Sequence, residues 1–192
     1  MPYFGVLVVG EDLVSEECSP DTIINDGRHG KRLAEMLDSS GVSCDIVGGI
    51  QEVDRAAIKK LIWISIMWLL CHDCKQGEQP IASAEVHKLK RRDVDQLLQE
   101  LVPAANKLME KFHSTGTERD IEGIGSIVEV ANHLETYSLS MPTAIPNKLL
   151  AIDEFECRNG YLLSMEDIVG VPQKFHRQLV KRVVGYVPRY HC

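Results

Sequence analysis

Two adjacent lysines are the first residues whose position suggests chemistry. Lys59 and Lys60 lie where a helix predicted to start near Glu52 changes from amphipathic to apolar on all sides. In the ordinary arrangement a lysine at such a place extends its ammonium into solvent. Beside a cleft, the same ammonium can polarise a substrate carbonyl and donate a proton to it. From spacing alone, the solvent-facing arrangement is favoured.

A second group of polar residues interrupts an apolar helical pattern near the end of the chain. Glu154 and Arg158 are four residues apart, so an exposed ion pair on one helix face is the ordinary expectation. Asn159 and Gly160 follow directly, and both are poorer helix formers than the residues around them. Because these two residues lower the stability of a helix, their presence here indicates a packing or functional reason.

The run Cys71-His72-Asp73-Cys74 has the thiol spacing of a zinc site or a redox pair. A zinc site needs a second ligand pair, and the sequence holds no other closely spaced Cys/His pair. The run also ends an apolar helix instead of following a βα turn. Reduced structural thiols are therefore favoured, with no metal site. The same reading applies to all six cysteines, which show no framework spacing: Cys18, Cys44, Cys71, Cys74, Cys157 and Cys192.

Glycine-rich loops that cradle phosphates are not found in the sequence. The pair Gly123-x-Gly125 is too short for a dinucleotide fingerprint and follows a polar segment. The pair Gly48-Gly49 follows a predicted strand but has no third glycine at the required position. These segments predict no dinucleotide site of their own.

Charge and hydropathy exclude two classes of partner. The net charge of −7 argues against a nucleic-acid surface, and the basic run 88–92, followed by Asp93 and Asp95, is expected to be a solvated helix face. The longest apolar run, Leu61–Cys71, is too short to cross a bilayer. The apolar stretch Phe4–Val9 lacks the basic leader of a signal peptide. We expect a soluble protein of the cytoplasm or another intracellular compartment.

The elements that must position these residues form two parts. Residues 1–50 predict a small α/β lobe, with a strand over Tyr3–Val9, a helix over Gly27–Ser40 and a strand over Val42–Val47. Residues 51–192 predict an all-helical domain. Its expected helices cover Glu52–His72, a stretch from Ser83 that Pro103 kinks or divides, Ser126–Tyr137, Asn147–Met165, and Pro172–Val184. The expected fold class is mainly α with a small α/β lobe.

The order of these pieces resembles the second part of ketopantoate reductase (2-dehydropantoate 2-reductase). The family's Trp-x-Lys-Leu pattern is similar to Ile58-Lys59-Lys60-Leu61, which aligns Lys60 with the family's lysine. Its Ser-Met segment is similar to Ser140-Met141, and its Thr-Glu-Ile-Asp-x-x-Asn-Gly segment is similar to residues 153–160. Its Gly-Ile-x-x-Pro segment is similar to residues 169–172. The collinearity of the four segments, more than any one of them, carries the resemblance.

The resemblance implies a site and a reaction. In the family, NADPH reduces a 2-keto acid, so Lys60 would protonate the forming alkoxide, Glu154 would orient that lysine, and Ser140 would hold the substrate carboxylate. One and two helical turns after the lysine, where the family has substrate-binding asparagines, this chain has Ile64 and Trp68. The family's glycine fingerprint has no counterpart in this sequence.

The resemblance therefore implies the substrate and dimerisation half of a reductase that is not catalytic alone. Its helical domain would be like the C-terminal domain of ketopantoate reductase and 6-phosphogluconate dehydrogenase. The implied cofactor is NADP, and the implied partners are a small 2-keto acid and a second copy of the chain. The alternative is a non-enzymatic helical interaction or dimerisation module whose active site has been lost.

Overall fold

The computed structural model describes residues 50–75, 77–113 and 123–185, together with residues 9, 10, 32, 35, 36, 39, 46 and 47. The chain divides into two compact units, Met1–Ala57 and Ile58–Cys192. The predicted domain boundary after residue 50 lies at the start of helix α2 (Ile50–His72), whereas the division between the two units lies within this helix, after Ala57. That boundary stays a prediction.

In the first unit, two short strands pair in parallel. Strand β1 (Val9–Gly10) lies beside β2 (Ile46–Val47), with Val9 opposite Ile46. Parallel strands need a crossover between them, and the described residues of that stretch, 32, 35, 36 and 39, are helical. The rest of the predicted strands and helix of this lobe lies outside the described residues.

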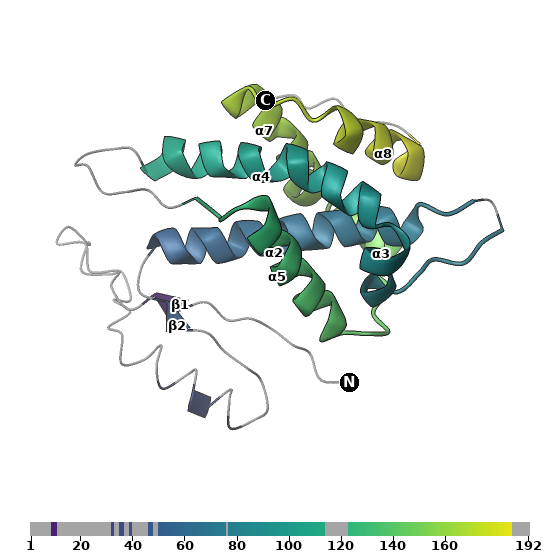
Figure 1. The fold of residues 1–192 in the computed structure, drawn as a ribbon, viewed down its shortest axis with the longest axis horizontal. Coiled ribbons are helices and arrows are strands. Elements are labelled where there is room, and N and C mark those ends of the chain that lie inside the picture. Colours follow the sequence, from purple (N-terminus) through teal and green to yellow (C-terminus); the bar gives the residue numbers. More distant parts are fainter. Residues whose placement is uncertain are drawn as a thin grey trace. The chain divides into compact units, whose positions relative to one another are not determined.

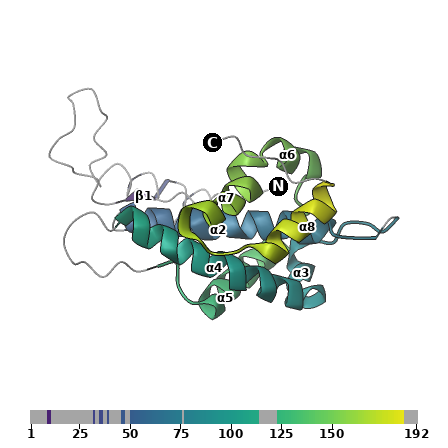
Figure 2. The same cartoon turned by 90° about the horizontal axis from the view of Figure 1, so that it is seen from above.

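Helix α2 (Ile50–His72) lies in the middle of the helical unit, as Figures 1 and 2 show from two sides. From Leu61 to Cys71 it is apolar except for Ser65, and its side chains from Ile66 to Leu70 are fully buried. A helix that is apolar on all sides must be surrounded by other elements. The prediction of a central buried helix is therefore confirmed.

The other helices of this unit pack around α2 and against one another (Figure 2). Helix α4 packs against α5, α7 and α8, and α3 packs against α4 and α5 (Figure 1). Their bounds are α3 (Ser83–Leu89), α4 (Arg91–His113), α5 (Ile127–Leu139), α6 (Lys148–Asp153), the π-helical turn η1 (Glu156–Gly160), α7 (Tyr161–Val169) and α8 (Lys174–Val184). The described part of the chain is mainly α-helical, as the sequence predicts.

Of the two outcomes predicted at Pro103, a kink or a division, the division is wrong, because α4 continues through this proline. The break falls instead at Lys90, whose backbone leaves the helical region at φ −129° and ψ 31°. The Lys90 ammonium lies within 3.3 Å of the Asp73 carboxylate, and its side chain is only 19% exposed. Residue 90 is thus not on the solvated helix face expected for the basic run 88–92.

In place of the single helix predicted over Asn147–Met165, the structure has three consecutive elements, α6, η1 and α7. Within η1, Arg158 has non-helical angles of φ −118° and ψ −105°. This turn buries Asn159, whose side chain lies 2.9 Å from Nε2 of the fully buried His176. The opposite ring atom, Nδ1, lies 2.8 Å from Oε1 of Gln173. The packing reason expected for Asn159-Gly160 is therefore a polar contact between η1 and α8.

No helix in the described part of the chain is long and apolar enough to cross a membrane.

Candidate functional site

Lys60 is exposed on α2, and its neighbour Lys59 is half-buried. Lys59 lies toward the start of α5: hydrogen bonds from Ser126 lower the pKa of Glu129, and the charge of Lys59 adds to that effect. The two adjacent lysines therefore differ in setting. Lys60 is the one whose ammonium is open to an incoming molecule.

Residues four apart on a helix share a face, so Lys60, Ile64 and Trp68 form one stripe along α2. Exposure falls along it, from the exposed Lys60 through the half-buried Ile64 to the fully buried Trp68. The Trp68 indole Nε1 has no hydrogen-bond partner among the described residues. Apart from the lysine, this face of α2 is apolar.

The end of α5 is fixed to α2 one turn beyond Lys60. The Trp63 indole Nε1–H donates to the Ser138 hydroxyl over 2.9 Å, and that hydroxyl in turn donates to the Leu134 carbonyl over 2.9 Å. The rings of Trp63 and Tyr137 meet edge to face, with centroids 4.6 Å apart. These contacts pack Tyr137 against Trp63, which follows Lys60 by three residues on α2.

Ser140 is exposed and forms the C-cap of α5. Its hydroxyl donates to the Tyr137 carbonyl over 2.7 Å, which leaves the oxygen lone pairs free but uses the proton. A serine that holds a carboxylate must donate this proton. Ser140 would therefore have to rotate before taking the role that the resemblance implies.

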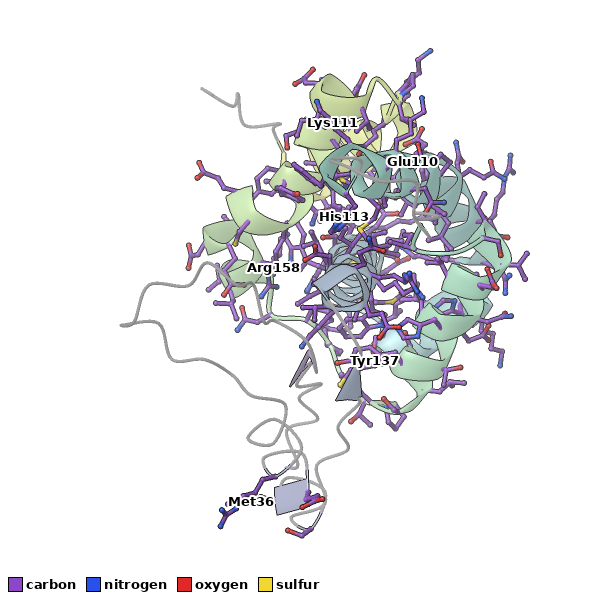
Figure 3. The ribbon with its side chains drawn as sticks, turned by 90° about the vertical axis from the view of Figure 1, so that its left-hand side faces the viewer. Met36, Glu110, Lys111, His113, Tyr137 and Arg158 are labelled. Carbon is purple, nitrogen blue, oxygen red and sulfur yellow. The ribbon has the colours of Figure 1, made fainter. Side chains whose placement is uncertain are left out.

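Glu154 is the C-cap of α6 and forms an ion pair with Arg158 across the π-helical turn. The ion pair expected from their spacing is confirmed. The Arg158 side chain is only 18% exposed, against 37% for Glu154. Figure 3, which looks along α2, shows Arg158 and Tyr137 on different sides of this helix.

The structure brings Lys60, Ser140 and Glu154 into one unit, but no hydrogen bond or ion pair joins any two of these three described residues. Their assignment as site residues stays a prediction. The pair Trp63–Tyr137 was not predicted from the sequence. Each of its residues lies three positions from a predicted site residue, since Trp63 follows Lys60 and Tyr137 precedes Ser140, and this spacing could have pointed to the pair.

The Cys71–Cys74 run has the character of structural thiols. Cys71 is buried, and burial raises the pKa of its thiol to about 12, whereas Cys74 is exposed; both are free. Asp73 between them accepts hydrogen bonds from Arg182 over 2.6 and 2.7 Å and pairs with Lys90. Within the described ranges, no group of three or more His, Cys, Asp or Glu side chains is placed to hold a metal ion.

The glycines at 123 and 125 serve packing. A Cβ at Gly123 would overlap the side chain of Asn106, which accepts from the Ile124 amide over 2.7 Å and donates to the Gly125 carbonyl over 3.1 Å. Gly125 has a φ of 110°, a left-handed conformation that favours glycine. The presence of glycine at positions 123 and 125 is thus explained by packing against Asn106 and by backbone conformation.

The chain shares its fold with a solved dehydrogenase. No protein-family model matches the sequence, and a search of curated proteins finds no match. Among solved structures, the chain is similar to a D-mandelate dehydrogenase in ternary complex with NADH and anilino(oxo)acetate. The TM-score is 0.57 and the identity 19%, over 84% of this chain and 62% of the dehydrogenase chain. This chain therefore has the fold of part of a dehydrogenase, specified by a very different sequence.

Proposed function

We propose that this chain is the substrate-binding, helical half of a nicotinamide-dependent reductase of 2-keto acids, and that it is not catalytic alone. The observation that carries the proposal is the shared fold over 84% of the chain with a dehydrogenase of D-mandelate. Mandelate is a 2-hydroxy acid, and removing a hydride and a proton from it gives a 2-keto acid. Ketopantoate, the substrate in the family that the sequence resembles, belongs to the same chemical class.

Lys60 has the charge and exposure that the reaction needs. Hydride addition to a keto carbon places negative charge on its oxygen, and an ammonium beside that oxygen supplies both charge stabilisation and a proton. In the proposed site Ser140 holds the substrate carboxylate. Glu154 orients Lys60 after exchanging its ion pair with Arg158 for a contact with the lysine.

The cofactor does not fit the described residues of this chain. They include no Gly-x-Gly-x-x-Gly turn between a strand and a helix, and the paired glycines near Asn106 are used for packing. The proposed cofactor, NADPH or NADH, therefore requires a nucleotide-binding part that these residues do not supply. For this reason we expect the chain by itself to show no turnover.

A helical interaction or dimerisation module is the second candidate function, and two observations favour it. The polar groups of the proposed site are bonded within the protein, Glu154 to Arg158 and Ser140 to the Tyr137 carbonyl. In addition, the Leu149 side chain on α6 is 73% exposed and Leu150 is 49% exposed. Exposed apolar side chains in a row are typical of a surface that contacts another protein.

Titration of the purified chain with ketopantoate and with phenylglyoxylate, each with and without NADPH or NADH, separates the two candidates. The proposal expects a 2-keto acid to bind and raise the melting temperature, without turnover. Lys60→Met should abolish this binding, whereas Lys59→Met, its matched control, should not. Turnover by the unmodified chain would contradict the statement that it is inactive alone. Absence of binding together with tight self-association would favour the interaction module.

A further inference from the structure

We propose that Asn159 is a site of spontaneous deamidation, which is protected in the folded chain and becomes reactive when η1 separates from α8. Asn159-Gly160 is the only Asn-Gly pair in the sequence. The reactants are these two residues and water, so the inference does not depend on the proposed function. It concerns a covalent modification that the chain undergoes by itself, whatever it binds.

The reaction needs a main-chain nitrogen that can reach the asparagine side chain. The Gly160 nitrogen loses its proton and bonds to Cγ of Asn159, which closes a five-membered succinimide ring and releases the side-chain nitrogen as ammonia. One water molecule then opens the ring at either carbonyl, giving aspartate or isoaspartate. Because glycine has no Cβ, nothing shields this nitrogen in the unfolded chain. Each of the other four asparagines precedes a residue with a side chain.

In the folded chain both reacting groups are held in place. The Gly160 N–H donates to the Phe155 carbonyl over 2.8 Å, across the π-helical turn. A proton engaged in this bond is harder to remove, and the nitrogen attacks only after losing it. The Asn159 side chain is fully buried, and its Oδ1 atom lies 2.9 Å from Nε2 of His176. Closure of the ring requires the amide to leave this contact.

The contact that holds the Asn159 amide comes from α8. His176 on this helix is fully buried, and its other ring nitrogen lies 2.8 Å from Oε1 of Gln173. The Asn159 amino group has no hydrogen-bond partner among the described residues, so His176 provides the one polar contact of this side chain there. Proteins open locally in units smaller than the whole fold. Separation of η1 from α8 therefore frees the amide and lets the turn unwind.

Refolding does not reverse the modification. Isoaspartate adds one carbon atom to the main chain between residues 159 and 160, which displaces the Gly160 N–H from the Phe155 carbonyl. Aspartate keeps the main chain but puts a carboxylate in place of a fully buried amide, which lowers stability. The fraction of deamidated chain therefore records how much time this segment has spent open.

The test is incubation of the full chain at pH 8, folded and in concentrated urea, followed by peptide mass spectrometry. In urea, Asn159 should convert well before Asn147, its internal control, which precedes Lys148. In the folded chain Asn159 should convert at least about 10-fold more slowly, because only the open fraction of molecules reacts. Equal rates at Asn159 in the two states would overturn the protection. Conversion in urea no faster than at Asn147 would overturn the site itself.

A pair of variants tests the part played by α8. His176→Leu removes the partner of Asn159 and should raise the rate in the folded chain. Val86→Ala, the control, removes a buried side chain from α3, which packs against α4 and α5. Urea unfolding measures both stabilities, so the rates are compared for equal losses of stability. An equal rise in both variants would mean that only global unfolding admits the reaction, contrary to the proposal.

The parent chain decides the same point if His176→Leu does not fold. Local opening exposes less surface than global unfolding, so below the unfolding transition its rate of deamidation should depend less steeply on urea concentration than global unfolding does. Equal steepness would contradict a local opening of η1.

Discussion

His176 makes the stability of this protein depend on pH, and the structure fixes the sign. The ring is fully buried between η1 and α8, and burial lowers the pKa of the imidazole from 6.5 to about 3. The positive charge of Arg177 adds to the effect. Below pH 6.5 the unfolded chain therefore binds a proton at this position that the folded chain does not bind. The contribution of the neutral ring to the free energy of unfolding is fully present above pH 6.5 and is lost progressively as the pH falls toward 3.

The hydrogen bonds around the ring specify its tautomer. The Gln173 side-chain nitrogen donates to the Leu162 carbonyl over 2.5 Å, so its oxygen faces the ring and accepts from Nδ1–H. In the neutral ring Nε2 must then accept. The atom 2.9 Å from Nε2 is Oδ1 of Asn159; turning this amide by 180° would present to Nε2 its amino group, which has no other hydrogen-bond partner among the described residues. A neutral ring is bonded through both nitrogens in that orientation, and what opposes an added proton is the burial of its charge and the nearby charge of Arg177.

The magnitude follows from the displaced pKa. Each pH unit between 6.5 and about 3 removes about 1.4 kcal/mol of stability. Acidification from pH 6.5 to 5 should therefore remove about 2 kcal/mol, a large share of a typical folding free energy of about 5–15 kcal/mol.

The assay is urea unfolding of the parent chain and of His176→Gln at pH 7.5, 6.5 and 5. The variant should be less stable at pH 7.5, because the ring packing is lost, but its further loss on going to pH 5 should be about 2 kcal/mol smaller than that of the parent chain. His87, whose pKa is also lowered by burial, contributes equally to both chains and cancels. The same pH dependence in His176→Gln and the parent chain would refute the reasoning.

Two further predictions concern the end of α2. Asp73→Asn should destabilise the chain by about 1–2 kcal/mol, because it weakens two charge-assisted hydrogen bonds from Arg182 and the pairing with Lys90. Thermal unfolding measures this loss, and an unchanged melting temperature would contradict the prediction. Iodoacetamide at pH 8 should label Cys74 in the folded chain and leave Cys71 unlabelled, since burial raises the pKa of the Cys71 thiol to about 12. Peptide mass spectrometry gives the two extents, and similar labelling of both in the folded chain would show that Cys71 is not buried.

Several features could be read from the sequence because they depend on local patterns. An apolar run such as Ile62–Leu70 has no hydrophilic face, so it had to be a central helix wherever the other elements lay. The four-residue spacing of Glu154 and Arg158 likewise placed them within reach of each other. The mainly α-helical fold expected from the sequence is also confirmed, and it is shared with a solved dehydrogenase, whereas the resemblance to ketopantoate reductase stays a prediction.

Other features were decided by contacts between segments far apart in sequence. The Lys90 side chain at the helix break bonds a carboxylate 17 residues earlier, and Asn159 of η1 contacts an imidazole 17 residues later. No local pattern encodes such partners. The same holds for Lys60, because a lysine's chemistry depends on which side chains other helices bring to it. The sequence determined which helices form and which side chains are able to react; only tertiary packing decided that the rings of Trp63 and Tyr137 meet and that His176 is buried uncharged.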